Sequence, residues 1–386
     1  YLLQPDGPNA GDPWEFTPEQ IRFVANWYAV DAAGRFIYRK GMLRRMKGWG
    51  KDPVAAALCC VEFVGPCRFA GWNGPGDPIV IPHPAAWVQV AAVSKDQTRN
   101  TMTLFPGMFS RRAIDEYQID LGKEIIYAHR GRCRIEAVTS SPRALEGGRA
   151  TFVEKNETHH WIQSNEGDEM AAVIARNAAK SRDGSARVLA ISNAHAPGEG
   201  SDAEQDYEAW QLQPEGFLYD SLEANGADIT TEEGIRAGLL YARGDSHWLD
   251  VDRLMAEIRD PKTPANTARR FYFNEIAASE ERAFDLDEWK ALAHPKTVEK
   301  DAIITLGFDG SDTRDHTVLV ATEVKTGYQW IAGYWEPRQQ PNGEYHVPVE
   351  EVRATIEAIF ERFNVWRFRA DPFRWKTEIA EWAGNY

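Results

Sequence analysis

Length, composition and charge set the first limits on this chain. Its 386 residues exceed what one compact core usually holds, so we expect two or three domains. A hydrophobic content of 43% with 14 Trp and 17 Phe excludes intrinsic disorder. The net charge of −14 argues against a protein coated in nucleic acid, but not against one that holds a duplex with a local basic surface.

The cysteines and the hydropathy indicate a protein without structural zinc or a membrane anchor. No CxxC pair and no histidine at zinc spacing accompany the four cysteines, which are Cys59, Cys60, Cys67 and Cys133. Reduced thiols in a cytosolic protein fit this pattern, and we expect neither a signal peptide nor a membrane span. Because Tyr1 is not an initiator Met and the last residues interrupt a helical pattern, we expect the chain to be a piece of something longer.

The first elements in chain order are a helix, a strand, a loop and a second helix. Thr17 can cap the first helix, with Pro18 in its first turn. Residues 35–45 alternate like a strand, and residues 53–64 are a helical run. Between them lies the loop MKGWGKDP, and this order of strand, glycine-containing loop and helix is the context that a phosphate-binding loop requires.

The loop matches the phosphate-binding pattern G-x-x-x-x-G-K-[ST] only in part. Gly50 and Lys51 are present, but Arg45 stands at the first glycine and Asp52 at the hydroxyl that should contact magnesium. Taken alone, a basic loop that forms a plain turn is the stronger interpretation. The candidate ATP-binding residues here are Arg45, Lys47, Gly48, Gly50, Lys51 and Asp52.

Strands and helices then alternate, which predicts a mostly parallel sheet in an α/β domain. We expect strands at residues 87–93, 150–154 and 187–193, a hairpin-like pair around Gly122 and Gly131, and a helix near Met170 to Lys180. The segment 151–161 reads TFVEKNETHHW, so that an apolar strand leads to Asn156 and Glu157. Glu157 is placed to polarise water, although an exposed residue at a helix start is an equally good interpretation.

The C-terminal part has the order β-β-β-α-β. Strand-like runs cover 302–311, 316–324 and 328–336, an amphipathic helix covers 347–363, and a fourth strand covers 365–371. Asp309 lies late in the first strand and Asp371 at the end of the fourth. We therefore expect one domain over 1–250, with a helical lid at 205–250, a linker over 251–300, and a second domain over 301–386.

In this order the motifs resemble those of a tailed-bacteriophage terminase large subunit, the ATPase of a DNA-packaging motor. FTPEQ resembles the adenine-side glutamine motif and implicates Gln20, and RRMKGWGKDP resembles the deviant Walker A. FVEKNETHHW resembles the Walker B strand with its catalytic glutamate, Glu157. LAISNAHAPGEGS resembles the coupling motif, which implies coupling roles for Ser192 and Asn193. Five modest matches, including AAVSKDQ, follow one another in the family's order, and the resemblance as a whole covers nearly the whole chain.

Two departures from the family pattern concern magnesium. Asp52 replaces the Walker A Ser/Thr, and Asn156 replaces the usual Walker B Asp. We hypothesise that the two exchange charge, so that Mg²⁺ has Asp52 as its carboxylate ligand and Asn156 as its amide ligand. The alternative is a crippled site, because a carboxylate beside the β-phosphate repels it. The resemblance also implies an arginine acting in trans, with Arg143 and Arg149 as candidates.

The second half resembles an RNase H-like nuclease. In that fold, acids on neighbouring strands hold two Mg²⁺ or Mn²⁺ ions, and Asp309 and Asp371 are the candidates. A turn aspartate and a helix-cap aspartate are the plainer interpretations. Asp312, Asp315 or Glu323 could add a ligand, but the family's third acid lies downstream of this chain, so the domain is expected to be incomplete at its C-terminus.

The sequence thus predicts an α/β protein with a P-loop ATPase domain of the ASCE type and an RNase H-like nuclease domain. The resemblance implies packaging of double-stranded DNA with ATP and Mg²⁺ in the host cytoplasm. It implies a portal protein, a small terminase subunit and a pentamer on the procapsid, with a monomer as the alternative for the isolated chain. The rival hypotheses are a P-loop scaffold that has lost hydrolysis and a helicase-like DNA repair enzyme.

Overall fold

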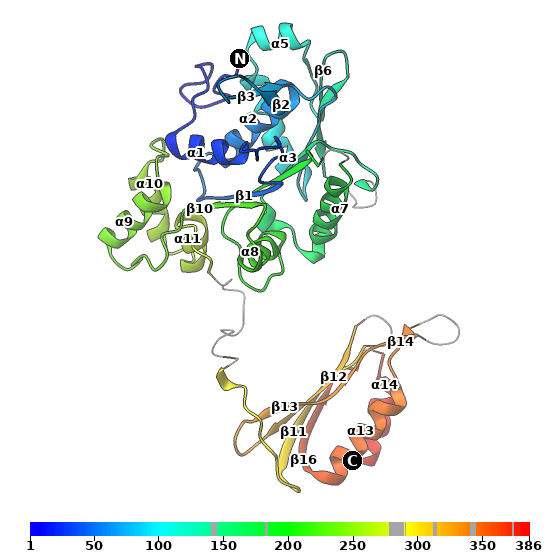
Figure 1. Ribbon diagram of the computed structural model, residues 1–386. Helices are drawn as coiled ribbons and strands as arrows, with labels where there is room; N and C mark the ends of the chain where they lie inside the picture. The colour runs from blue at the N-terminus through cyan, green and yellow to red at the C-terminus, as the bar shows by residue number, and fades with distance from the viewer. Residues whose placement is uncertain are drawn as a thin grey trace. The chain divides into compact units, whose positions relative to one another are not determined.

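The computed structural model shows two compact units, residues 1–283 and 284–386, each with its own hydrophobic core (Figure 1). The structure describes residues 1–139, 145–181, 184–277, 289, 291–311, 315–339, 345–372 and 374–386. In this part of the chain, no helix combines the length and the apolar character needed to cross a bilayer.

An eight-stranded sheet forms the centre of the first unit, in the order β10-β1-β9-β8-β4-β7-β6-β5. Every pair from β10 to β7 is parallel, and the last two pairs are antiparallel. This result confirms the predicted, mostly parallel sheet. The strands are β1 (Lys40–Arg44), β4 (Trp87–Ala91), β5 (Asp120–Leu121), β6 (Ile125–Ala128), β7 (Cys133–Val138), β8 (Phe152–Asn156), β9 (Arg187–Ser192) and β10 (Phe217–Ser221).

Helices cover both faces of the central strands, which explains why β8 and β9 are buried throughout. On one face lies α2 (Lys51–Val64), whose small residues Ala55 to Ala57 pack against the sheet. On the other face lie α7 (Gly167–Ala179) and α8 (Asp202–Leu212). The first helix, α1 (Pro18–Trp27), begins with the predicted capping box at Thr17.

Shorter elements surround this core. They are the hairpin of β2 (Arg68–Trp72) and β3 (Pro78–Ile81), α3 (Lys95–Met102), α4 (Phe105–Met108), α5 (Arg111–Tyr117), η1 (Thr158–His160) and η2 (Gln163–Asn165).

Three further helices belong to the first unit: α9 (Glu232–Arg243), α10 (Val251–Arg259) and α11 (Ala265–Tyr272). Figure 1 shows them grouped beside the β10 end of the sheet. Met255 and Ile258 of α10 are buried in the main core, so the predicted linker over 251–300 begins too early. The predicted lid over 205–250 is also wrong in part, because α8 covers the sheet and β10 is one of its strands.

The second unit confirms the predicted β-β-β-α-β order. Its sheet has the order β13-β12-β11-β16, and β11 is antiparallel to β12 but parallel to β16. Two helices pack on one face through Val352, Ile356 and Trp382. The elements are β11 (Ile303–Asp309), β12 (Thr317–Glu323), β13 (Gln329–Trp335), β14 (Arg338–Gln339), β15 (Tyr345–His346), α13 (Val349–Arg362), β16 (Asn364–Ala370) and α14 (Lys376–Asn385).

A buried ionic network joins α2 to the sheet. Glu62 is fully buried and accepts hydrogen bonds from Arg187 Nη2 at 2.5 Å, Arg68 Nη1 at 2.7 Å and the Tyr28 hydroxyl at 3.0 Å. Burial alone would raise the pKa of Glu62, but the charges of Arg187 and Arg68 hold this pKa below its usual value. The carboxylate is therefore charged and depends on both arginines.

We expect Arg187→Ala to lower the free energy of unfolding of the first unit by about 3–5 kcal/mol, because it leaves a buried carboxylate short of a partner. Urea unfolding at pH 7 measures this change. Arg111→Ala is the matched control: it removes an exposed pair with Asp115 at 3.1 Å and should cost less than about 1 kcal/mol. Equal losses in the two variants would contradict the role given to Glu62.

Candidate functional site

The loop between β1 and α2 has the backbone geometry of a phosphate-binding turn. Gly48 and Gly50 have φ angles of 83° and 99°, a left-handed conformation that favours glycine, and Gly50 caps α2. Trp248 Nε1 donates to Gly48 O at 2.9 Å, and the Ser246 hydroxyl donates to Trp49 O at 3.0 Å. Residues that lie 200 positions away in the sequence thus hold the loop in place.

Several amide groups of this loop are free to bind an anion. Lys47 N donates to Phe271 O at 2.7 Å, and Trp49 N donates to Met46 O at 3.3 Å. Within the described residues, four backbone amide groups donate a hydrogen bond to no protein acceptor: those of Gly48, Gly50, Lys51 and Asp52. The last two open the 14-residue helix α2, where the helix dipole also favours a negative charge.

Lys51 and Glu157 meet beside this turn. The Lys51 side chain is 4% exposed, and its Nζ lies 3.9 Å from Glu157 Oε1 and 3.5 Å from Met46 O. Glu157 directly follows β8 in a left-handed conformation, with φ 51°. The pKa of Glu157 is raised, mainly by burial and also by the charge of Asp52. The charges of Lys51 and Lys47 lower this pKa but do not cancel the rise. The carboxylate is therefore a stronger base than an exposed glutamate.

Asp52 and Asn156 lie in direct contact, but through the amide nitrogen of Asn156 and not through the oxygen that the charge-exchange hypothesis assigns to Mg²⁺. Asn156 Nδ2 donates to Asp52 Oδ1 at 2.9 Å, and it lies 3.1 Å from Thr101 Oγ1 and 3.3 Å from Glu154 Oε1. The contact with the Asp52 carboxylate assigns this atom as the amide nitrogen, so the amide oxygen points away from Asp52.

The sequence reasoning missed two residues of this cluster. Glu154 is fully buried; burial raises its pKa well above the usual value and the charge of Asp52 adds to the rise, so we expect it to be neutral at pH 7. Its position two residues before Asn156, on the same side of β8, was a signal in the sequence. Thr101 gave no such signal, because only the packing of α3 brings it here.

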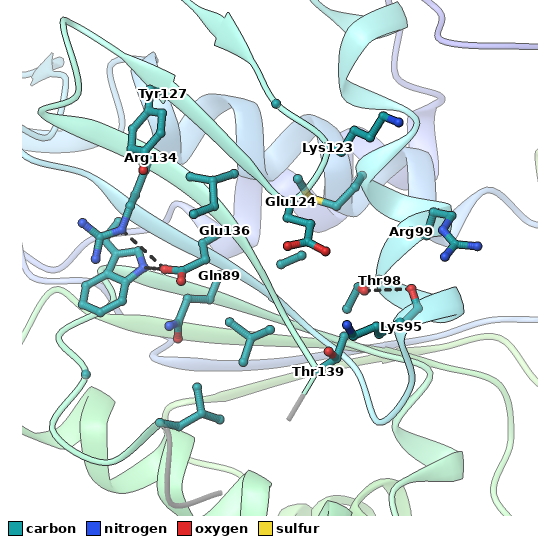
Figure 2. Close-up of a pocket in the computed structure, with 18 of the residues that line it drawn as sticks. Gln89, Lys95, Thr98, Arg99, Lys123, Glu124, Tyr127, Arg134, Glu136 and Thr139 are labelled. Carbon is teal, nitrogen blue, oxygen red and sulfur yellow. Dashed lines mark hydrogen bonds and ion pairs between the residues drawn. The ribbon is translucent and has the colours of Figure 1, made fainter. Parts of the chain in front are cut away.

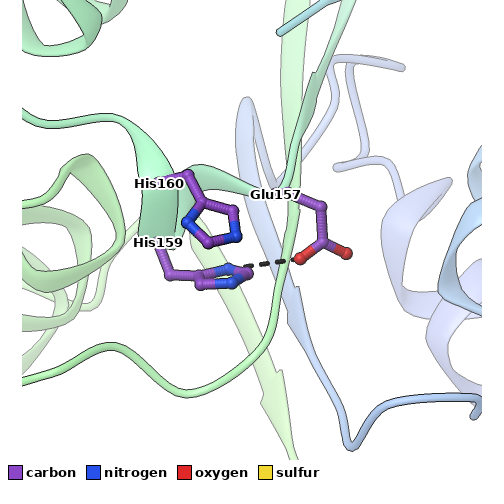
Figure 3. Close-up of side chains that lie close together, drawn as sticks. All are labelled: Glu157, His159 and His160. Atoms are coloured by element: carbon purple, nitrogen blue, oxygen red, sulfur yellow. Dashed lines mark ion pairs between the residues drawn. The ribbon is translucent and has the colours of Figure 1, made fainter. Parts of the chain in front are cut away.

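His159 lies between Glu157 and the end of β9, and Figure 3 shows its close contact with Glu157. His159 Nδ1 lies 3.2 Å from Glu157 Oε2 and 3.2 Å from Ser192 Oγ, and His159 N donates to Ser192 Oγ at 3.1 Å. Burial lowers the pKa of His159 well below its usual value, and the nearby His160 and Lys51 lower it further. His159 is therefore neutral, and it joins two predicted site residues.

Glu157, His159 and His160 could also be considered as metal ligands, since their ligand atoms lie within 4.8 Å of one another. In the described part of the chain this is the only such group. The two imidazole rings, however, lie 4.0 Å apart at 40°, so they lie over each other instead of converging on one point. The arrangement does not fit a metal centre, and His159 is instead hydrogen-bonded to Ser192.

The predicted coupling residues contact the phosphate-binding turn through its backbone. Asn193 Nδ2 donates to Arg45 O at 2.8 Å, and Arg45 N donates to Ser192 O at 3.2 Å. A shift of β9 would therefore move the start of the turn.

The remaining predicted ATP-binding residues differ in where they lie. Gln20 is buried beside the turn, with its Oε1 held by Thr17 N at 3.1 Å. Lys47 is exposed. The Arg45 side chain is 1% exposed, pairs with Asp220 and lies over the Trp49 ring at 4.9 Å, so its guanidinium is engaged within the protein.

The two candidate arginines also have different outcomes. Arg143 lies outside the described residues. Arg149 is described and exposed, three residues before β8. Among the contacts of the described residues, Arg149 has none with the phosphate-binding turn of its own chain.

A cavity of about 1270 Å³ lies elsewhere in the first unit, between α3, the strands β5 to β7 and residues 145–148 (Figure 2). Glu136 accepts a hydrogen bond from Trp87 Nε1 at 2.8 Å, and Arg134 lies 3.8 Å from the Trp87 ring centre. No predicted ATP-binding residue lines this cavity, so it is not the phosphate site.

In the second unit, the predicted acids Asp309 and Asp371 lie at the same end of neighbouring strands. Phe308 of β11 pairs with Ala370 of β16, and Asp371 N donates to Phe308 O at 3.1 Å. Glu323 pairs with Ile304 at the other end of β11, about 17 Å away, and it is held by Lys296. Glu323 is therefore excluded as a third ligand.

Of the other two candidate ligands, the structure describes only one. Asp312 lies outside the described residues. Asp315 is exposed, and its amide donates to Ser311 Oγ at 3.1 Å.

The path of the chain defines the class of protein. The fold is that of a bacteriophage large terminase: the crystal structure of the HK97 large terminase matches 97% of this chain and 74% of that one, with a TM-score of 0.52 and 17% identity. The resemblance inferred from the motifs is confirmed at the level of the fold. No protein-family model matches the chain.

The chain belongs to the family of the mycobacteriophage Gene 13 proteins. It is 41% identical to the Gene 13 protein of Mycobacterium phage D29 and 40% identical to that of Mycobacterium phage L5. Each alignment covers 96% of this chain and 68% of the relative.

Proposed function

We propose that the first unit hydrolyses ATP. The observation that carries this proposal is the meeting of free amide groups, Lys51 and Glu157 at the N-terminus of α2, where Nζ and Oε1 lie 3.9 Å apart. The amides and Lys51 would hold the β- and γ-phosphates, and Gln20 would contact the adenine side. Glu157 would orient water and accept its proton, for which its raised pKa is favourable.

The residues present also fit Mg²⁺. Asp52 supplies a carboxylate and Thr101 a hydroxyl, which are the hard oxygen ligands that this ion prefers, and the Asn156 amide would have to turn its oxygen towards Asp52 to join them. When bound, Mg²⁺ would neutralise charge on the phosphates. Neutral Glu154 behind Asn156 limits the negative charge of the cluster to about one carboxylate plus Glu157.

We further propose that ATP hydrolysis drives the packaging of double-stranded DNA. The support is the large-terminase fold and the chain Glu157–His159–Ser192, which links the proposed water-positioning carboxylate to the strand that contacts the turn. A pentamer on the procapsid, with portal protein and small terminase subunit as partners and an arginine acting in trans, belongs to the same proposal.

We expect Glu157→Gln to leave ATP binding intact and to lower kcat by about 10²- to 10⁴-fold, because the proton acceptor is lost. Lys51→Ala should instead abolish nucleotide binding. Isothermal titration with a non-hydrolysable analogue and a phosphate-release assay measure the two effects, with exposed Lys123→Ala as the control.

DNA-stimulated phosphate release separates the motor from a P-loop scaffold without hydrolysis. Dependence on a procapsid, without strand separation, separates it from a helicase-like repair enzyme. Hydrolysis that survives in Glu157→Gln would disprove the role of this residue.

The Asp52–Asn156 contact predicts a double-mutant cycle. Asn156→Asp places a second carboxylate about 3 Å from Asp52, a repulsion of about 5 kcal/mol at an effective dielectric constant of 20. The Mg²⁺-dependent kcat/KM for ATP should therefore fall at least tenfold. Asp52→Ser added to Asn156→Asp replaces the repulsion by a hydroxyl–carboxylate hydrogen bond and should restore activity. A double variant no more active than Asn156→Asp would show that the two residues do not exchange charge.

For the second unit we propose a metal-dependent endonuclease. The support is the register of β11 and β16, which sets Asp309 and Asp371 side by side at one sheet edge. Two carboxylates there would hold Mg²⁺ or Mn²⁺, and the ions would activate water and stabilise the leaving oxygen of a phosphodiester.

We expect Asp309→Asn and Asp371→Asn each to abolish Mn²⁺-dependent nicking of a supercoiled plasmid, because each removes a charged ligand. Agarose gels with and without EDTA measure the cleavage. Asp301→Asn, an exposed position at the opposite end of β11, is the control and should cut like the wild type. Cleavage that persists without Asp309 and Asp371 would place the nuclease site elsewhere.

A further inference from the structure

The sheet of the second unit has one covered face and one open face. Leu306 and Phe308 of β11 and Phe368 of β16 lie in or against the core formed with α13 and α14. Because side chains alternate along a strand, Arg367 and Arg369 lie on the opposite face. Both are exposed, on the strand at the edge of the sheet.

The strand register places these arginines in line with the two acids. Thr305 pairs with Arg367 and Gly307 with Arg369, and the next position on this face holds Asp309 beside Asp371. Arg369 is therefore one pleat repeat, about 6.6 Å, from Asp371, and Arg367 lies one repeat further. Two positively charged side chains thus lie in a row along β16, next to the acid pair.

Within the described residues of this unit, no protein group neutralises these two cations. Arg338 and Arg353 of the same unit are paired with Glu351 and Glu378. For Arg367 and Arg369, the described residues provide no ion pair and no hydrogen bond. Like charges that share one face of a strand repel each other, so the pair is better suited to an external anion.

The surface beside Arg369 is unobstructed. A Cβ atom added to Gly307 would have nothing within 4 Å, so a ligand can approach the backbone of β11 closely there. At the register shift between Ile304 and Thr305, Trp366 is 64% exposed, and Arg367 lies 5.1 Å from its ring centre. The surface along β16 therefore offers positive charge, an exposed aromatic side chain beside Arg367 and close access to the backbone of β11.

We propose that Arg367 and Arg369 bind the phosphodiester backbone of a DNA duplex and guide one strand to Asp309 and Asp371. This proposal rests on the nuclease function proposed above and names the surface that holds its substrate. The arginines are positioning residues: they act on the phosphates that flank the scissile one and not on the reacting atoms.

The test measures binding of a 30-base-pair duplex to the full chain, without nucleotide and with Ca²⁺ as the only divalent ion, by fluorescence anisotropy over a range of KCl concentrations. In R367Q/R369Q the slope of log Kd against log salt should fall by roughly two, about 0.9 for each lost phosphate contact. At 0.1 M salt this corresponds to a loss of affinity of roughly 60-fold. R367K/R369K should keep most of the slope, and Lys325→Gln, an exposed cation in the β12–β13 turn, should change neither value.

Plasmid nicking supplies the second readout. In R367Q/R369Q the KM for DNA should rise while kcat stays within about twofold, which a merely structural role would not produce. Asp309→Asn should lose cleavage but keep the wild-type salt slope. An unchanged slope in R367Q/R369Q overturns the proposal even if the wild type cuts DNA. If the wild type does not cleave DNA but the salt slope is still reduced in R367Q/R369Q, the DNA-binding surface is supported and the proposed nuclease activity is wrong.

Discussion

The parallel pairing of β1, β9 and β8 is the constraint on which the proposed ATP site depends. In register, Arg44 lies beside Ser192, and Ile191 lies beside Asn156, so three strands end at the same level. The segments that follow are the phosphate-binding turn, the coupling residues and Glu157. Parallel strands bring chemistry to one edge because all their carboxyl ends meet there. No one of these segments would form a site alone.

Burial controls the charges at this edge. Burial disfavours the charged forms of Glu154 and His159, whereas Lys51 and Arg45 are buried cations beside the turn. Lys155 has the opposite outcome: its Nζ lies 2.6 Å from Asp202 and 3.3 Å from Asp206, which more than offsets burial and raises its pKa. This ion pair fixes β8 to α8. Lys155 lies on the opposite side of β8 from Glu154 and Asn156.

The two proposed sites lie at the same kind of position in their sheets. In each, polar groups stand at the ends of adjacent parallel strands whose flanks are apolar, β8 and β9 in one and β11 and β16 in the other. In the first unit, helices cover both faces of the sheet, so a ligand can reach only the ends of the strands. The second covers one face and leaves the other accessible to an extended ligand. A small anion suits the first arrangement, and a long polyanion suits the second.

Local patterns in the sequence determined the elements and their order. The capping box at Thr17, the β-β-β-α-β string and the acids at strand ends needed only periodicity and turn chemistry, which act over a few residues. The tertiary structure decided what each polar side chain contacts. The sequence predicts Arg45 as a phosphate ligand, whereas in the structure its guanidinium is buried and pairs with Asp220, 175 residues away. The position of α10 in that core, the contact of Thr101 with Asn156 and the exclusion of Glu323 likewise arise from long-range packing and strand register, which no local pattern encodes.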